Sequence, residues 1–303
     1  MKKFLQAIIA DPHSGEALQY YTTAKELTNE KTGTRYKVEN GVPVLLPAEP
    51  AQVAEHSRLH SEQGSAFDYA DHYQKDAEHF DYFKAHEDGA SRHENRRLHE
   101  TIIRAIPEDA SLVLDAGCGS GWVAAHFCPK GVKVISMDIS TVNPREALRR
   151  VHHELHAGLV GDVYHIPLKK NSVDCIIASE IMEHVASPRL FVEKLLETVR
   201  PGGTVIITTP YDEQIEYYLC VHCNQPTPKN GHLHFFNLEN IGQYLPEKGG
   251  AWRAGAFSNK YLSKLRSHIL FEGLPYFAWR FIDRLACQVL GAETRFLIEI
   301  TKE

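Results

Sequence analysis

Apolar positions along this chain change their spacing about one third of the way from the N-terminus. Residues 93–106 repeat them at helical spacing and Pro107 follows, so the pattern predicts an amphipathic helix that ends at the proline. Beyond it, short runs rich in β-branched residues alternate with helix-like segments. The runs that we interpret as strands are 112–114, 132–137, 173–178, 204–209 and 295–301.

Strands that alternate with helices predict a parallel sheet with helices on both faces. For residues 93–303 we therefore predict an α/β fold: a Rossmann-like, doubly wound, mostly parallel sheet of seven strands, with an insertion at about 212–235. Residues 1–48 hold short runs broken by turn signals, of which Asn40-Gly41 favours a hairpin, and predict a small β-rich domain. Residues 49–92 are polar and rich in histidine, and predict a connector with some helix.

Composition narrows the class of protein. Of 303 residues, 43% are hydrophobic and 24% charged, as in an ordinary globular protein. The net charge of −6 and the lack of a basic run disfavour nucleic acid as a partner. No apolar run reaches 18 residues, so no membrane span is predicted, and residues 269–290 are interpreted as an amphipathic helix. Six mostly isolated cysteines favour free thiols and a cytoplasmic location.

A glycine-rich turn after the first strand of the α/β region carries the strongest signal. Asp115 ends the strand, and Gly117, Gly119 and Gly121 follow at alternate positions, where the backbone can approach a ligand closely. A dinucleotide fingerprint would need a glycine where Trp122 stands, and the Gly-Lys-Ser/Thr of a phosphate loop is absent. The turn therefore indicates a ligand without a pyrophosphate.

Two more acids follow the next strands. Asp138 lies about 20 residues on, where a carboxylate can accept both hydroxyls of a ribose. Asp162, in Gly161-Asp162-Val163, ends a further strand that we expect between 132–137 and 173–178 and count as the third, where it could accept the amino hydrogen of an adenine. Each alone is an ordinary turn residue, but with Asp115 the three acids mark one edge of the sheet and predict a nucleoside site.

Together with Ala178–Val185 and Arg200–Gly203, these motifs resemble the class I S-adenosylmethionine-dependent methyltransferases, in the branch of the ubiquinone-biosynthesis methyltransferases. The resemblance covers about residues 93–210. It implies S-adenosylmethionine as the cofactor, with its methionine end at Asp115 and the glycine turn, and an aromatic cap from the connector. The residues it places at the cofactor are Tyr73, Asp115, Gly117, Cys118, Gly119, Asp138, Ile139, Asp162, Val163 and Glu180.

The candidate catalytic residues are Glu180, Glu183 and His184, at the end of the fourth strand. An oxygen acceptor needs a base or a metal ion, and carboxylates with one imidazole suit a divalent ion. The segment looks like the magnesium site of some quinone O-methyltransferases and small-RNA 2′-O-methyltransferases. Magnesium, a general base at His184 and a brace for the loop all stay open. The Asn/Asp-Pro-Pro-Tyr motif of amine acceptors is absent here, which favours transfer to oxygen or carbon.

A second cluster lies in the insertion. Cys220, Cys223, His232 and His234 have a spacing that could close a structural zinc site, and the alternative is that they line the mouth of the substrate site.

Residues 1–48 also resemble the small zinc-ribbon-like activator domain of tRNA and translation-factor methyltransferases. The first cysteine pair of that domain is replaced here by Asp11-Pro12-His13-Ser14, and no cysteine occurs at 27–30, where the second is expected. We therefore predict a zinc-ribbon-like domain without metal ligands, which serves in packing or substrate capture.

These observations favour a cytoplasmic methyltransferase that acts on a small molecule or biosynthetic intermediate. Two alternatives are an RNA or protein methyltransferase, which the N-terminal segment suggests, and a cofactor-binding assembly protein without transferase activity. A lidded cavity would favour a metabolite and an open groove a polymer. The sequence is compatible with a homo-oligomer.

Overall fold

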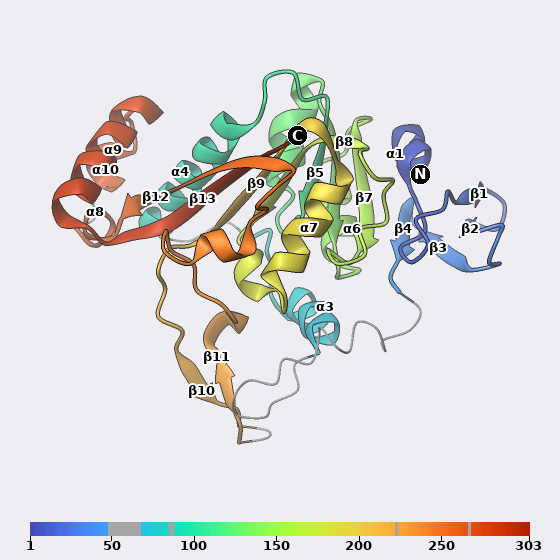
Figure 1. Cartoon of the computed structure of the whole chain (residues 1–303), viewed down its shortest axis with the longest axis horizontal. Coiled ribbons are helices and arrows are strands. Elements are labelled where there is room, and N and C mark those ends of the chain that lie inside the picture. Colours follow the sequence, from blue (N-terminus) through green and yellow to red (C-terminus); the bar gives the residue numbers. More distant parts are fainter. Residues whose placement is uncertain (48–67, 85–87, 222–223, 266–267) are drawn as a thin grey trace.

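The computed structural model describes residues 1–47, 68–84, 88–221, 224–265 and 268–303 (Figure 1). Its centre is an 11-stranded sheet in the order β1-β2-β3-β4-β7-β6-β5-β8-β9-β13-β12. The seven strands from β7 to β12 confirm the predicted α/β fold, and only β13 runs antiparallel to both of its neighbours. Their bounds are β5 (Leu112–Ala116), β6 (Lys133–Asp138), β7 (His156–Gly161), β8 (Val173–Ser179), β9 (Val199–Pro210), β12 (Gly250–Asn259) and β13 (Glu293–Lys302).

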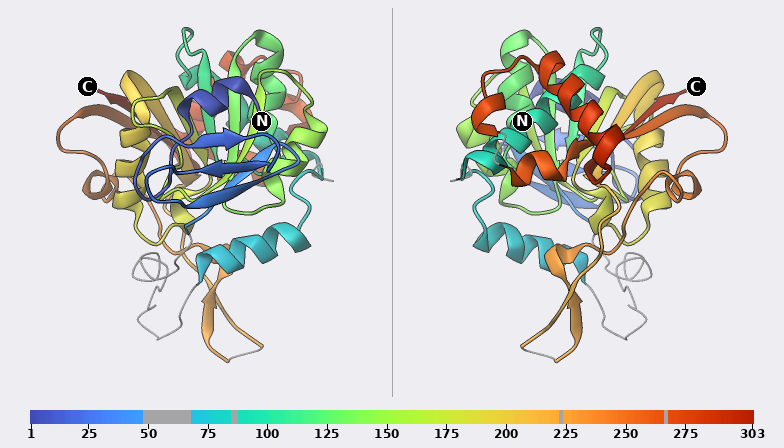
Figure 2. Two further views of the ribbon diagram at one scale, coloured as in Figure 1. Left: turned by 90° about the vertical axis from the view of Figure 1, so that its right-hand side faces the viewer. Right: turned by 90° about the vertical axis from the view of Figure 1, so that its left-hand side faces the viewer.

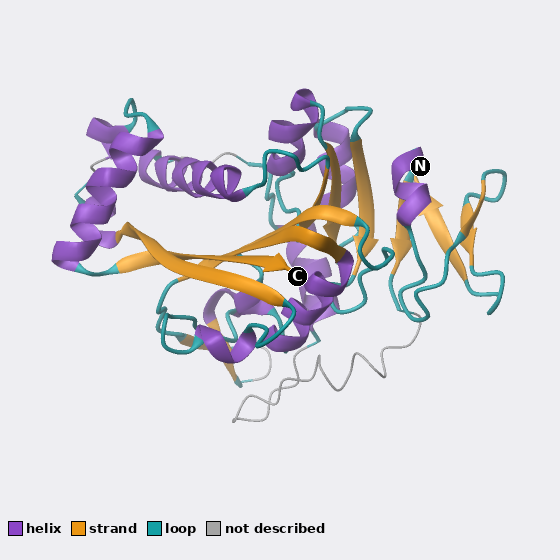
Figure 3. Cartoon of the chain, turned by 45° about the horizontal axis from the view of Figure 1, so that its top comes forward, coloured by secondary structure: helices purple, strands orange, loops and turns teal. Residues whose placement is uncertain are grey.

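Helices cover both faces of this sheet (Figures 1 and 3). Alternate residues of β8 face the two sides: Ile176 packs into the core that contains Phe191 of α7, and Ile177 into the core that contains Ile102 of α4. The main helices are α4 (Gly89–Ala105), α5 (Trp122–Phe127), α6 (Asn143–Arg150), α7 (Pro188–Thr198) and α10 (Tyr276–Leu290). In the described ranges, no helix is both long and apolar enough to cross a membrane.

The remaining elements lie around the edges of the sheet. Helix α3 (Tyr69–His79) forms part of the predicted connector, and β10 (Tyr217–Leu219) and β11 (Pro226–Pro228) form a hairpin that projects from the insertion (Figure 2). Two short helices, α8 (Lys260–Lys264) and α9 (His268–Phe271), precede α10. The 3-10 helices are η1 (Cys128–Lys130), η2 (Met182–His184), η3 (Lys229–Gly231) and η4 (Ile241–Tyr244).

The N-terminal segment continues the central sheet. After α1 (Lys3–Ile8), strands β1 (Gln19–Tyr21), β2 (Glu26–Thr28), β3 (Arg35–Glu39) and β4 (Val42–Leu45) pair in antiparallel order. Strand β4 then pairs in parallel with β7, with Val44 opposite Val160. Leu45 is buried in the same core as Leu159, so this segment shares a hydrophobic core with the α/β fold.

Asp11 and Asn29 connect the two turns at which the resemblance to a zinc ribbon would place cysteine pairs. Asp11 Oδ1 accepts hydrogen bonds from the backbone N–H groups of His13 and Ser14, at 2.9 and 3.0 Å. Asp11 Oδ2 accepts from Asn29 Nδ2 at 3.0 Å and from the Tyr36 hydroxyl at 3.1 Å. Both Asp11 and Asn29 are buried, so a satisfied hydrogen-bond network holds the turns together.

We expect Asp11→Ala to lower the free energy of unfolding by about 3 kcal/mol, because it leaves buried donors without an acceptor. Burial raises the pKa of Asp11, but the four hydrogen bonds outweigh burial and hold the pKa below its usual value. This stabilisation is therefore complete above pH ~4, the unfolded pKa, and is lost as pH falls through the folded pKa. Urea melts at pH 7 and in acid measure both effects, and the difference between variant and wild type should shrink in acid.

A matched control for that prediction is Glu16→Ala, which removes an exposed ion pair with Lys31 in the same segment. Its effect should stay within about 1 kcal/mol. Equal losses in the two variants would contradict a special role of Asp11.

Candidate functional site

A cleft of about 1760 Å³ opens at the carboxyl ends of the parallel strands. All ten residues that the resemblance places at the cofactor line this cleft, as do Glu183 and His184. Parallel strands bring their carboxyl ends to one edge of the sheet, and for that reason acids far apart in sequence lie around one cavity.

The glycine turn forms one wall of the cleft. Gly117, Gly119 and Gly121 have φ values of +75°, +39° and +68°, in the left-handed region that favours glycine. A side chain on Gly117 would also overlap Ile181, whose Cγ1 atom would lie 2.7 Å from the new Cβ. The backbone N–H groups of Gly117 and Cys118 donate to the carbonyl of Met137, which holds the turn against β6.

Two of the three predicted acids, Asp115 and Asp138, lie in this wall, and their charges interact. Asp115 is buried, and its Oδ2 has no hydrogen-bond partner among the described residues. Burial, and then the charge of Asp138, raise the pKa of Asp115 to about 8. Asp138 accepts hydrogen bonds from the N–H of Ser140 at 2.9 Å and from Asn143 Nδ2 at 3.1 Å, which orient its carboxylate. A cationic group beside Asp115 would stabilise its charged form.

The third acid has a partner that the sequence did not reveal. Asp162 Oδ2 accepts from the hydroxyl of Tyr69 at 2.6 Å, and its Oδ1 accepts from the N–H of Tyr164 at 2.9 Å. Tyr69 is the first residue of α3. The connector helix therefore reaches the adenine end of the predicted cofactor site.

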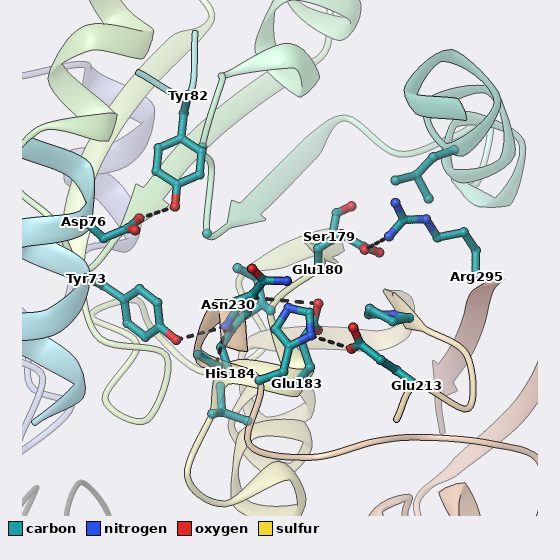
Figure 4. Close-up of a pocket in the computed structure, with 18 of the residues that line it drawn as sticks. Tyr73, Asp76, Tyr82, Ser179, Glu180, Glu183, His184, Glu213, Asn230 and Arg295 are labelled. Atoms are coloured by element: carbon teal, nitrogen blue, oxygen red, sulfur yellow. Dashed lines mark hydrogen bonds and ion pairs between the residues drawn. The ribbon is translucent and has the colours of Figure 1, made fainter. Parts of the chain in front are cut away.

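Helix α3 also reaches the predicted catalytic end. The Tyr73 hydroxyl lies 3.0 Å from His184 Nδ1, with the two rings edge to face. On the same helix, Gln74 Oε1 accepts a hydrogen bond from the N–H of Thr141, at 2.9 Å. The helix thus contacts both ends of the cleft, and Figure 4 shows Tyr73 pointing at His184.

Glu183 lies buried at the centre of the site, in η2. Its Oε2 accepts from the Thr209 hydroxyl at 3.0 Å, and its Oε1 lies 3.9 Å from His184 Nε2. Burial, and then the neighbouring charge of Glu180, raise the pKa of Glu183 well above its usual value. Burial, and then His232, lower the pKa of His184 to about 4, so this imidazole is neutral at pH 7.

His232 reaches this centre from the insertion. Its ring centroid lies 4.8 Å from that of His184, and its Nδ1 pairs with Glu213 Oε2. The ligand atoms of Glu183, His184 and His232 lie within 4.8 Å of one another. In the part of the chain that the structure describes, this is the only group of three or more such residues that could hold a metal ion.

Among the described residues, the members of the predicted zinc site do not cluster together. Cys223 lies outside the described residues, and Cys220, His232 and His234 do not form a ligand cluster. His234 is partly buried and packs against Phe236, whereas His232 turns toward His184. The left-handed φ of Gly231 just before them helps to set this local path.

Glu180 lines the cleft but points away from the group of three. It has a φ of +57°, which is strained for a residue with a side chain, and it forms an ion pair with Arg295 of β13 (Figure 4). Two charged residues that form ion pairs at the site, Arg295 and Glu213, were not identified from the sequence. Neither stands in a motif, because each meets its partner only through the packing of distant segments.

Comparison with known proteins follows the same lines. Residues 90–250 match a family described as a methyltransferase domain. A malonyl-[acyl-carrier protein] O-methyltransferase of Erwinia billingiae is 27% identical over 149 residues, 48% of this chain and 59% of that protein. A ubiquinone biosynthesis O-methyltransferase of Ralstonia nicotianae is 31% identical over 127 residues, 40% and 52% of the respective chains. The matches thus span little more than half of these relatives.

Among solved structures, a putative S-adenosylmethionine dependent methyltransferase of Listeria monocytogenes has a similar fold. The TM-score is 0.50 at 14% sequence identity, over 69% of this chain and 98% of the other. At this identity the likeness concerns the fold alone.

Proposed function

Because this chain belongs to the methyltransferase-domain family, we propose that it transfers a methyl group from S-adenosylmethionine to oxygen or carbon of a small molecule. The observation that carries the proposal is the meeting of Asp115, Asp138 and Asp162 with the glycine turn in one cleft. When bound, S-adenosylmethionine supplies an electrophilic methyl group. The residues present fit it: Asp115 has a buried oxygen with no hydrogen-bond partner among the described residues, which suits an ammonium group.

The three acids, the glycine turn and Tyr73 then each have a defined task. Asp115 and the glycine turn hold the methionine end, Asp138 the ribose and Asp162 the adenine, with Tyr73 as a cap. The contacts of α3 with both ends of the cleft support a small acceptor over a polymer, because a helix packed against the site helps to orient a small substrate and limits the access of water. The two relatives, a malonyl-[acyl-carrier protein] O-methyltransferase and a ubiquinone biosynthesis O-methyltransferase, also support a biosynthetic intermediate as the acceptor. The cytoplasmic location stays a prediction.

We further propose that Glu183, His184 and His232 hold a divalent metal ion beside the acceptor. The second ring nitrogens support this: His232 Nδ1 faces the Glu213 carboxylate, and His184 Nδ1 lies 3.3 Å from the Gly231 carbonyl oxygen. Metal-binding histidines are usually oriented by such acceptors, which leave Nε2 free for the ion. One carboxylate and two imidazoles suit manganese or zinc better than the magnesium considered from the sequence. In this ligand group His232 takes the place that the sequence had suggested for Glu180.

The proposal is tested first by cofactor binding. Asp138→Ala should weaken binding of S-adenosylhomocysteine by about 10- to 150-fold in calorimetry, the loss expected for hydrogen bonds to a charged group. The matched control Glu193→Ala removes an exposed carboxylate of α7, which pairs with Arg189, and should leave the affinity unchanged. NAD should not bind either protein. Unchanged affinity in Asp138→Ala would remove this residue from the ribose site.

A further inference from the structure

We propose that the outer face of α8–α10 binds anionic phospholipid membranes peripherally, beside the mouth of the cleft. The surface concerned, which we call the C-terminal apolar face, gathers exposed large hydrophobic side chains from residues 265–289. Its members are Leu265, Ile269, Leu270, Phe277, Phe281, Leu285 and Val289. An exposed apolar patch of this kind marks an interaction site in a soluble protein.

A row of apolar side chains on α10 faces solvent. Phe277, Phe281, Leu285 and Val289 follow one another at intervals of four residues, so they form one stripe along the helix. Phe277 is 72% exposed and Val289 is 79% exposed. The inner side of α10 carries the buried Trp279 together with a buried acid, Asp283, so the exposed stripe is apolar surface in addition to the packed side of the helix.

Specific contacts on the inner side hold this face outward. Asp283 accepts hydrogen bonds from the N–H groups of Ser258 and Asn259, at 3.1 and 2.8 Å. The buried Arg97 donates to the carbonyls of Phe271 and Leu274, both at 2.9 Å. Turning the helix to bury the apolar stripe would leave the Asp283 carboxylate and the Arg97 guanidinium without these partners.

The excess of positive charge around the C-terminal apolar face favours binding to an anionic surface. Residues 260–290 contain five Lys or Arg and two Asp or Glu, in a chain whose net charge is −6. Arg284 is exposed on α10, and the exposed Arg104 lies over the ring of Phe277, with its Cζ atom 4.5 Å from the centroid. Apolar side chains flanked by cations are the pattern of helices that lie in the interface of an anionic membrane.

The C-terminal apolar face lies close to the cleft, which relates membrane binding to access of the substrate. In two views α8, α9 and α10 lie together at the end of the molecule opposite the N-terminal strands (Figures 1 and 2). Lys260 and Lys264 of α8 are exposed and line the cleft. A protein docked by the C-terminal apolar face would thus hold its cleft next to the lipid surface, where an acceptor with an apolar tail is dissolved.

Sedimentation of the full chain with vesicles tests this proposal without any substrate. Vesicles of phosphatidylcholine with about 30% phosphatidylglycerol should bind the protein at least about ten-fold more strongly than phosphatidylcholine alone. The double variant Phe277→Ser/Phe281→Ser should lose at least about ten-fold of this partitioning, because two aromatic rings no longer enter the interface. Arg284→Glu should lose about five-fold or more on anionic vesicles only.

The matched control is Val221→Ser, which removes a side chain that is 99% exposed at the β10–β11 hairpin. It should partition like the wild type, and thermal melts should show that all variants are folded. Absence of wild-type binding, or equal binding by the double variant, would overturn the proposal. A third outcome would also overturn it: wild-type protein that does not bind vesicles and is a dimer in sedimentation velocity, with the double variant a monomer. A second copy of the chain would then cover the face.

Discussion

Glu183→Gln should release bound metal and reduce methyl transfer at least about a hundred-fold. Glutamine keeps an oxygen that can accept from Thr209, which donates to Glu183 at 3.0 Å, so the fold should be retained. It removes the charge that makes Glu183 the anionic ligand of the group with His184 and His232. A divalent ion in this position would stabilise a developing oxyanion by several kcal/mol, and each 1.36 kcal/mol corresponds to a factor of ten in rate.

Metal content by elemental analysis, with manganese and zinc supplied in turn, measures this prediction independently of activity. The matched control is Glu180→Gln: it removes a carboxylate from the same cleft, but one that pairs with Arg295 outside the group of three, so metal should stay bound. Glu213→Gln should weaken metal affinity by about 10- to 100-fold, because Glu213 orients His232.

Other outcomes distinguish the mechanisms that the sequence left open. Full activity in excess chelator, with no metal in the purified protein, would contradict the metal site. His184→Ala would then report on the remaining roles. A loss in turnover with intact cofactor affinity would identify His184 as a base, and a loss in cofactor affinity alone would identify a brace of the loop.

Gly117→Ala should abolish measurable cofactor binding, with a loss of at least about a hundred-fold. The left-handed φ of +75° costs an alanine about 1–2 kcal/mol, and the new methyl group would also overlap Ile181. The turn must therefore move, and the backbone that should contact the methionine end moves with it. Calorimetry with S-adenosylhomocysteine measures the loss.

Gly131→Ala separates the two causes. Gly131 also has a left-handed φ, +88°, but no atom of the described residues lies within 4 Å of the position of its new Cβ, and Gly131 is not among the described residues that line the cleft. Gly131→Ala should lower the free energy of unfolding through the same kind of backbone strain as Gly117→Ala. It should leave the cofactor affinity unchanged. Equal affinity losses in both variants would mean that destabilisation, rather than the turn, accounts for the effect.

The α/β fold and the edge of the sheet at which the cleft lies could both be predicted from the sequence. Both follow from local signals: apolar runs mark buried strands, and residues just after them lie at the carboxyl ends, wherever those strands pair. Asp115, Asp138 and Asp162 could therefore be assigned to one cleft from the sequence, and they line it. The glycine turn was equally readable, because its backbone geometry requires glycine.

Long-range packing determines which side chains join Glu183 and His184 in the cleft. His232 and His234 looked alike in sequence, yet one meets His184 and the other packs against Phe236, because backbone geometry and packing direct neighbouring side chains differently. The same holds at the N-terminus, where the apolar run of β4 could have closed a separate domain but pairs with β7, more than 100 residues away. Local sequence patterns indicate that a segment forms a strand or that a side chain can act as a ligand. Which strand or side chain it contacts depends on long-range packing.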